Sequence, residues 1–151
     1  MSEKFELDEN TLPKFKTKFG IFHDAVVHRV VLDLFKQDKI ILIIGTHDWS
    51  LSNDPTKNWV NVSIVLENLT WFVFKQLPRH RLGIIFRLNI DSYDSKIHID
   101  LLGNTDKPSQ HIYEENLTSH ECGFAIVASN GFYTVSEYTT TIDSNIDMEQ
   151  L

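Results

Sequence analysis

The sequence predicts an all-β protein: a single-domain antiparallel β-sandwich or partly open barrel of about eight strands, with at most one short helix. Short runs alternate apolar and polar residues, β-branched and aromatic residues dominate these runs, and turn residues separate them at fairly regular spacing. A chain of 151 residues suits one domain. We divide it into an N-terminal arm (1–20), an antiparallel β domain (21–142) and an acidic, flexible tail (143–151).

The N-terminal arm is expected to pack loosely, because its apolar residues are too sparse to define a strong helix. Pro13 can lie only near the start of a helix or in an extended segment. Phe15 and Phe19 are expected to hold the arm against the β domain. A helix hidden in this arm, or a helical segment from Ala25 to Phe35, would make the protein α+β instead.

The β domain begins with a predicted hairpin. Residues 26–34 are rich in valine, which favours a strand over a helix, and Gln37-Asp38-Lys39 reads as a tight turn. Ile40–Ile44 is apolar on both faces, which is typical of a central strand covered on both sides. A long polar loop, Gly45–Asn58, follows this strand.

Three strands are predicted between residues 59 and 91. The alternating run Val60–Leu66 forms the first, Asn68 interrupts it, Thr70–Leu77 forms the second, and alternation from Ile84 to Ile90 forms the third. Their inward positions are expected to be core residues: Val62, Ile64, Phe72, Ile84, Phe86 and Leu88.

The C-terminal part of the β domain adds further strands. A turn at residues 92–95 leads into the strand 96–102, and the second long polar loop is Gly103–Ser119. The two last strands, 121–128 and 132–141, flank Ser129-Asn130-Gly131. Because Asn and Gly both tolerate positive φ, this triplet predicts a hairpin turn.

The composition excludes several classes of function. The formal net charge of −7 disfavours binding to nucleic acids or anionic membranes, and it suits a basic partner. The single cysteine, Cys122, cannot form an intrachain disulfide. Neither a signal peptide nor a membrane-spanning apolar run is recognisable, so we expect a cytoplasmic protein.

No catalytic or cofactor signature stands out, and we expect a protein that is not an enzyme and carries no cofactor or metal. A nucleophile elbow, a glycine-rich phosphate loop and an H-E-x-x-H motif are all lacking. Metal binding would have to recruit scattered ligands such as His47, Asp48, His98 and Asp100. A metal-dependent hydrolase that uses His23, His47 and His98 is therefore the weakest alternative.

Phe22-His23-Asp24-Ala25 stands before a hydrophobic strand, and this opening resembles that of small all-β bacterial proteins with an F-H-D-[AS] tetrapeptide. Those proteins continue with a hairpin, a strand similar to Val60–Leu69 and a late strand pair similar to Cys122–Glu137. Several such families are assigned as immunity proteins of polymorphic toxin systems. The resemblance implies a non-catalytic protein that binds and blocks a cognate toxin, and it carries over no binding residues.

We therefore predict a protein-binding domain, with a basic toxin domain as its partner and binding residues on its loops. The alternative is a small-molecule or carbohydrate-binding β-sandwich whose pocket is lined by His47, Trp49 and Tyr93. Trp59 and Trp71 belong either to a binding surface or to the core. The candidate binding residues are His23, Asp24, His47, Asp48, Trp49, Asp54, Tyr93, Glu114 and Glu115.

Overall fold

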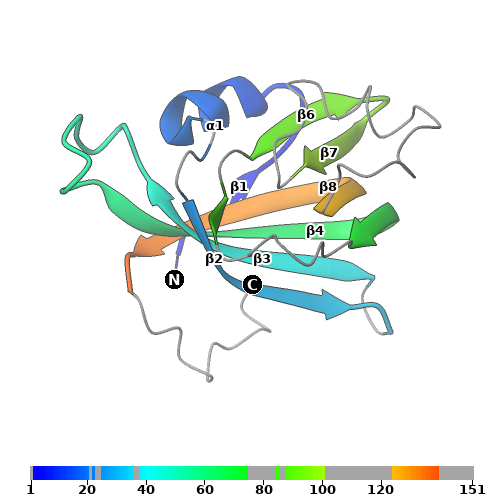
Figure 1. The fold of residues 1–151 in the computed structure, drawn as a ribbon. Coiled ribbons are helices and arrows are strands. Elements are labelled where there is room, and N and C mark those ends of the chain that lie inside the picture. The colour runs from blue at the N-terminus through cyan, green and yellow to red at the C-terminus, as the bar shows by residue number, and fades with distance from the viewer. Residues whose placement is uncertain are drawn as a thin grey trace.

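The computed structural model describes residues 2–20, 22, 25–35, 38–74, 84–85, 88–100 and 124–139. The strands and the helix within these ranges are β1 (Phe5–Glu6), α1 (Leu12–Phe19), β2 (Ala25–Asp33), β3 (Lys39–His47), β4 (Trp59–Phe74), β5 (Ile84–Ile85), β6 (Asn89–Tyr93), β7 (Lys96–Asp100) and β8 (Phe124–Glu137). They form one antiparallel sheet with α1 packed on one of its faces (Figure 1).

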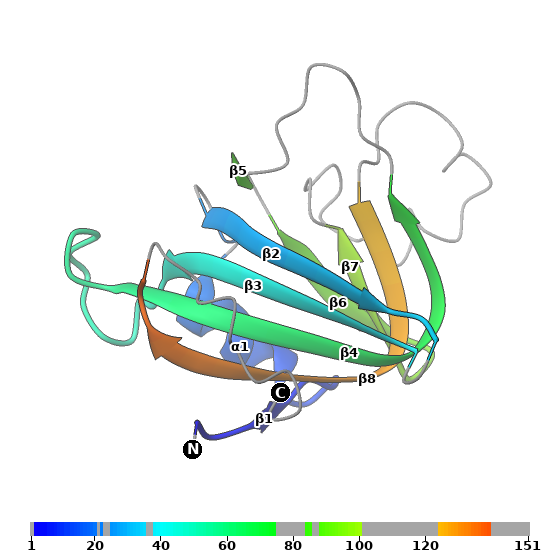
Figure 2. The same ribbon diagram turned by 90° about the horizontal axis from the view of Figure 1, so that it is seen from below.

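The sheet is open, with the strand order β5-β2-β3-β4-β8-β7-β6, and β1 pairs with the C-terminal half of β8. Figure 2 shows the sheet curving around α1 like part of a barrel wall. The predicted all-β architecture of about eight strands and one short helix is thus confirmed. We call the face that α1 covers the helix face, and the opposite one the outer face.

The spine of the sheet is a pair of long strands. β4 and β8 run antiparallel from Val60 opposite Glu137 to Phe74 opposite Phe124. Their register shifts between Leu69 and Trp71, next to Asn68 with its positive φ of 53°. The sequence predicted two strands separated at Asn68, whereas the structure keeps one strand and places a β-bulge there. A bulge bends the strand without ending its pairing, which explains the difference.

The hairpin predicted at Ser129-Asn130-Gly131 is wrong. β8 runs straight through this triplet, with Asn130 opposite Glu67 and Gly131 opposite Leu66. Gly131 does not have a positive φ. A Cβ atom on Gly131 would lie 2.8 Å from Ile97 Cδ1 and 3.2 Å from Leu66 Cδ2. The glycine is therefore needed for close packing and not for a turn.

Two other hairpins are found, with strands that extend into the residues the sequence assigned to the turns, because Lys39 belongs to β3 and Tyr93 belongs to β6. β2 and β3 form the expected hairpin, with Asp33 opposite Lys39. β6 and β7 are joined at Asp94 and Ser95, whose φ angles of 52° and 57° fit a two-residue turn of the primed type. This turn is formed by an Asp-Ser pair, whereas the sequence predicted a hairpin turn of this type at Asn130-Gly131.

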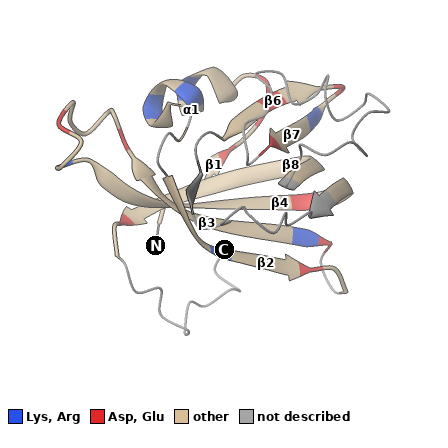
Figure 3. Cartoon of the chain, viewed as in Figure 1, with Lys and Arg blue, Asp and Glu red and all other residues tan. Residues whose placement is uncertain are grey.

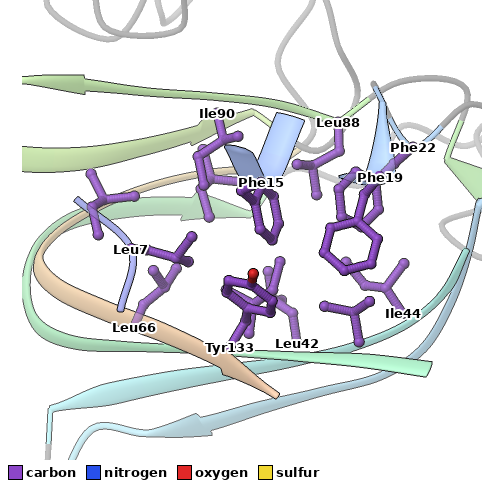
Figure 4. Close-up of a cluster of buried hydrophobic side chains, with 14 of the residues drawn as sticks. Leu7, Phe15, Phe19, Phe22, Leu42, Ile44, Leu66, Leu88, Ile90 and Tyr133 are labelled. Carbon is purple, nitrogen blue, oxygen red and sulfur yellow. The ribbon is translucent and has the colours of Figure 1, made fainter. Parts of the chain in front are cut away.

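Helix α1 closes the core, unlike the loosely packed arm predicted from the sequence. Leu12, Phe15 and Phe19 fall on one side of the helix and are all buried. The Phe15 ring lies 5.0 Å from Phe19 and 4.8 Å from Tyr133 of β8 between ring centroids (Figure 4). Few apolar residues suffice here, because their spacing puts every one of them against the sheet.

The core lies between α1 and the helix face, and it contains three of the six predicted core residues. Val62, Ile64 and Leu88 are buried, and Phe72 is partly buried against them. The side chain of Ile84 and all of Phe86 lie outside the described residues. On the outer face a second cluster contains Ile41, Ile43 and Val65. Strand β3 is thus covered on both faces, as its sequence predicted.

Several predictions fall on residues that the structure does not describe. They concern the second long loop, Gly103–Ser119, the single Cys122 and the tail 143–151.

Candidate functional site

The loop between β3 and β4 is closed at its base by main-chain hydrogen bonds. The amide of Asp48 donates to the carbonyl of Asn58 at 2.8 Å, and the amide of Leu51 donates to the carbonyl of Asp48 at 3.1 Å. The side-chain amide of Asn58, which is fully buried, donates to the carbonyl of Ser52 at 2.9 Å. The loop therefore has a fixed shape before it meets any partner.

Asp48 ties this loop to helix α1. Its carboxylate is 2% exposed, lies 3.4 Å from Lys18 Nζ and accepts hydrogen bonds from the Ser50 amide and hydroxyl. The amide of Trp49 also donates to the carbonyl of Lys18, at 2.8 Å. The sequence placed Asp48 among exposed binding residues, whereas the structure buries it as the anchor of the loop.

The tip of the loop carries the exposed charge. Asp54 accepts hydrogen bonds from the Thr56 hydroxyl at 2.7 Å and the Thr56 amide at 2.9 Å. These bonds, the one from the hydroxyl first, lower the pKa of Asp54. Lys57 Nζ lies 3.9 Å away and is largely exposed. Figure 3 shows acidic residues spread over loops and strand ends rather than gathered on one face.

Two large apolar side chains project from this fixed loop into solvent. Trp49 is 41% exposed and Leu51 is 62% exposed. Large apolar groups held on a rigid scaffold, with a charged neighbour, are typical of the centre of a protein-binding surface. We call Trp49, Leu51 and Asp54 together the loop surface.

An unbroken series of rings leads from the loop surface across the sheet. Centroid distances are 5.1 Å from Trp49 to His47, 4.2 Å from His47 to Trp59, 5.3 Å from Trp59 to Tyr138 and 5.8 Å from Tyr138 to His28. We call these five residues the aromatic row. His47 and Trp59 are paired across β3 and β4, on the outer face. All five rings are partly exposed, so the row is a surface feature.

Gly45 allows two of these rings to approach the backbone of β3 closely. A Cβ atom on Gly45 would lie 2.7 Å from both His28 Nε2 and a ring carbon of Tyr138. Beside them, Asn61 donates to the carbonyl of Thr139 at 3.4 Å. Burial lowers the pKa of His28, which keeps its imidazole neutral near pH 7.

Buried polar groups lie beneath the row. His28 Nε2 and Asn61 Oδ1 are both buried, and a hydrogen bond between these two side chains offsets part of the effect of burial on the pKa of His28. Nδ1 of His47 lies 2.6 Å from Asn58 Oδ1, to which it donates. The row therefore presents apolar ring faces to solvent and keeps polar groups beneath them.

The structure brings together only some of the predicted binding residues. His47 and Trp49 are adjacent in the aromatic row, and Asp54 is at the tip of the same loop. Tyr93 is 58% exposed but lies at the far end of the sheet, in the β6–β7 hairpin (Figure 1). The predicted pocket of His47, Trp49 and Tyr93 is therefore not formed. The remaining candidates lie outside the described residues: His23, Asp24, Glu114 and Glu115.

Sequence reasoning did not propose Tyr138 and His28 as site residues, and it left Trp59 undecided. Trp59 could have been found from the β3–β4 register, which sets it opposite His47. Tyr138 directly follows β8 and is distant in sequence from the rest of the row. His28 is the extra residue where the β2–β3 register shifts. Sequence alone gives no signal for such a bulge.

No arrangement for catalysis or metal binding is found among the residues that the structure describes. No three His, Cys, Asp or Glu side chains in these ranges are placed to hold a metal ion. A pocket of about 280 Å³ lies between the β1–α1 connection and the β6–β7 hairpin, lined by Asp8, Ser92 and Lys96 among others. The Asp8 carboxylate in it already accepts from the amides of Asn10 and Thr11.

Comparison with known proteins adds no further assignment. No helix in the described ranges is long and apolar enough to cross a membrane. No protein-family model matches the chain, and neither a curated protein nor a solved structure gives a significant match. The function must therefore be argued from the loop surface and the aromatic row.

Proposed function

We propose that this chain is a non-catalytic protein-binding domain that contacts its partner through the loop surface. In line with the F-H-D-A resemblance, the partner is a bacterial toxin domain that the chain blocks in the cytoplasm. The observation that carries the proposal is the fixed β3–β4 loop, which holds Trp49 and Leu51 in solvent.

The energetic argument rests on preorganisation. Ordering a flexible loop during binding costs free energy, which lowers affinity. Here the bond from Asp48 to Asn58 and the ion pair between Asp48 and Lys18 already fix the loop. Burial of Trp49 and Leu51 then contributes to affinity with little loss of conformational entropy. Tryptophan is also among the residues that most often dominate binding energy.

The test is a binding measurement with the toxin domain encoded beside the gene for this chain. We expect Trp49→Ala and Leu51→Ala each to raise the Kd by about tenfold or more, because both truncate the centre of the interface. Trp71→Ala is the matched control, since Trp71 is 36% exposed on the other half of β4. Its Kd should stay within about twofold of the parent value.

Equal effects of the loop variants and the Trp71 control would show that the loop surface is not the contact element. Absence of any toxin gene beside this one, together with no protection of cells that express a toxin domain, would overturn the toxin-blocking role.

The second candidate function is carbohydrate binding, which the aromatic row favours. Sugar rings present apolar faces that pack on aromatic side chains such as those of Trp49 and Trp59. Titration with a panel of oligosaccharides, followed by tryptophan fluorescence, tests it. Binding that Trp59→Ala removes and Leu51→Ala leaves intact would support this function, and an unresponsive spectrum with the whole panel would exclude it for those sugars.

A further inference from the structure

In the described part of the chain, the outer edge of β2 beyond Val26 has no partner strand. Among the residues that the structure describes, β2 pairs on this side only with β5, through Ala25 and Val26. The five residues from Arg29 to Asp33 pair with β3 on their inner side. An open edge presents main-chain amides and carbonyls to any strand that can align with it, and soluble proteins usually protect such edges.

Exposed apolar side chains accompany this edge. Leu32 is 43% exposed, Leu34 is 47% exposed, and Phe35 is fully exposed with a relative value of 102%. Three of the four residues from Leu32 to Phe35, at the end of β2 and directly after it, are large and apolar. Such a patch indicates an interaction surface.

The sequence of this edge is complementary to itself. If β2 pairs antiparallel with β2 of a second copy, and Val31 lies on the two-fold axis, Arg29 of each copy faces Asp33 of the other. Val30 then faces Leu32 of the second copy. Arg29, Val31 and Asp33 all lie on the outer face, because they pair with Ile43, Ile41 and Lys39 of β3. Directly opposed residues of antiparallel strands share a face, so the opposite charges meet.

Other symmetric registers are worse. Centring the pair on Arg29 sets two arginines opposite each other, and centring it on Asp33 does the same for two aspartates. Like charges directly opposite each other are destabilising. Centring on Val30 or Leu32 leaves every charge opposite an apolar or aromatic residue. Asp33 also lies opposite Lys39 in its own chain, so in the Val31 register the charges of Lys39, Asp33 and Arg29 alternate across three strands.

We propose that this chain forms a two-fold symmetric dimer in which the β2 edges of two copies pair around Val31 and join the two sheets into one. The bulge at His28 ends the regular edge at Arg29, which limits the pairing to this short segment. A two-fold contact uses the same edge of both copies and closes, so it does not extend into fibres. The β3–β4 loop lies at the other end of the strands and stays accessible (Figure 2).

A charge-exchange experiment tests the register. The dimer dissociation constant of the full chain is measured by sedimentation equilibrium. We expect Arg29→Asp and Asp33→Arg each to weaken association by about tenfold or more, because each sets like charges opposite each other twice. The variant with both changes restores opposite charges across the two-fold axis and should associate more tightly than either single variant, while the arginine at position 33 lies opposite Lys39 of its own chain and keeps the recovery partial. A parent that stays monomeric at millimolar concentration, or a dimer that ignores all three variants, would overturn the proposal.

A cysteine experiment gives a second answer that does not depend on charge. In a Cys122→Ser background, Val31→Cys should form a disulfide-linked dimer under mild oxidation, because the two Cβ atoms face each other across the axis. Leu32→Cys is the matched control. In the Val31 register, position 32 faces Val30 of the second copy. The two introduced cysteines are then offset by two residues and lie about 7 Å apart, which is at the limit of disulfide geometry. Crosslinking of Leu32→Cys that equals that of Val31→Cys would rule out the Val31 register.

Discussion

At the scale of single residues, Gly131 lies close to Ile97 and Leu66, and its neighbour Asn130 lies in the same strand, opposite Glu67. Asn130-Gly131 is the dipeptide most typical of a tight turn, yet both residues lie within β8 and pair with β4. Asn68 has the positive φ instead, within β4. The sequence shows that such residues permit a turn. The packing around Gly131 shows that this position requires glycine because there is no space for a side chain.

We predict that Gly131→Val destabilises the protein by about 1–3 kcal/mol through overpacking. The added methyl groups would meet Ile97 Cδ1, 2.8 Å from the Cβ position, and Leu66 Cδ2, 3.2 Å from it. Urea denaturation measures the loss. The variant Gly131→Val with Ile97→Val has more room and should recover part of it. If the second change brings no recovery, the contact with Ile97 Cδ1 is not the cause of the loss.

We predict that stability falls as the pH drops from 7.5 toward 5.5, with His98 as one contributor. His98 is fully buried, and burial lowers the pKa of its imidazole, while Asp91 raises it and Lys96 lowers it by smaller amounts. The unfolded chain then binds a proton near pH 6.5, which the folded chain still resists. The contribution of His98 to stability is therefore present above pH 6.5 and lost as the pH falls below it.

Urea denaturation at the two pH values measures this effect. The His98→Gln variant should show a smaller loss of stability between pH 7.5 and 5.5 than the parent, because its side chain does not titrate. An equal loss in both proteins would assign the pH dependence to other groups, such as His28.

At the scale of elements, α1 shows how few apolar residues can define a helix. Leu12, Phe15 and Phe19 are spaced by three and four positions, and Pro13 lies in the first turn, where proline is tolerated. The sequence contained both signals, but the lysines between them diluted the apolar character on which the prediction of a loose arm rested. Tertiary packing against Tyr133 decides the outcome.

We predict that Phe15→Ala destabilises the protein by about 3–5 kcal/mol, because it removes a fully enclosed ring at the centre of the core. Phe15 is 1% exposed and contacts Phe19, Phe22 and Tyr133. Lys14→Ala, on the exposed side of the same helix, should change the stability by less than about 0.5 kcal/mol. A loss below about 1 kcal/mol for Phe15→Ala would mean that α1 does not dock on the sheet.

At the scale of the whole molecule, fold class and binding site differ in how far sequence can predict them. Alternation along single strands is a local property, so β2, β3 and β7 could be predicted directly. Strand β4 was predicted as two strands, and the single strand predicted from Ile84 to Ile90 contains β5 and the start of β6 instead. The aromatic row depends on how four segments align with one another, including a bulge in β2. Strand register is a long-range property. The place of Trp59 and Tyr138 in the aromatic row therefore becomes visible only in the three-dimensional structure.

We predict that association with a basic partner slows as salt rises, because the net charge of −7 attracts such a partner over a distance. Raising the ionic strength from 0.01 M to 0.15 M shortens the Debye length from about 30 Å to about 8 Å. Stopped-flow measurement of the on-rate should show a fall of about tenfold or more. Asp54→Asn should reduce this salt dependence more than the control Asp94→Asn, which lies on the distant β6–β7 turn. An on-rate that does not change with salt would contradict electrostatic steering.

Because the hydrogen bond from Asp48 to Asn58 closes the β3–β4 loop at its base, substitutions at the tip leave the sheet undisturbed. The ion pair between Asp48 and Lys18 also lies at the base of the loop. Residues 51–56 can thus change during evolution without loss of the fold. We expect relatives of this chain to vary at residues 51–56 and to retain Asp48 and Asn58.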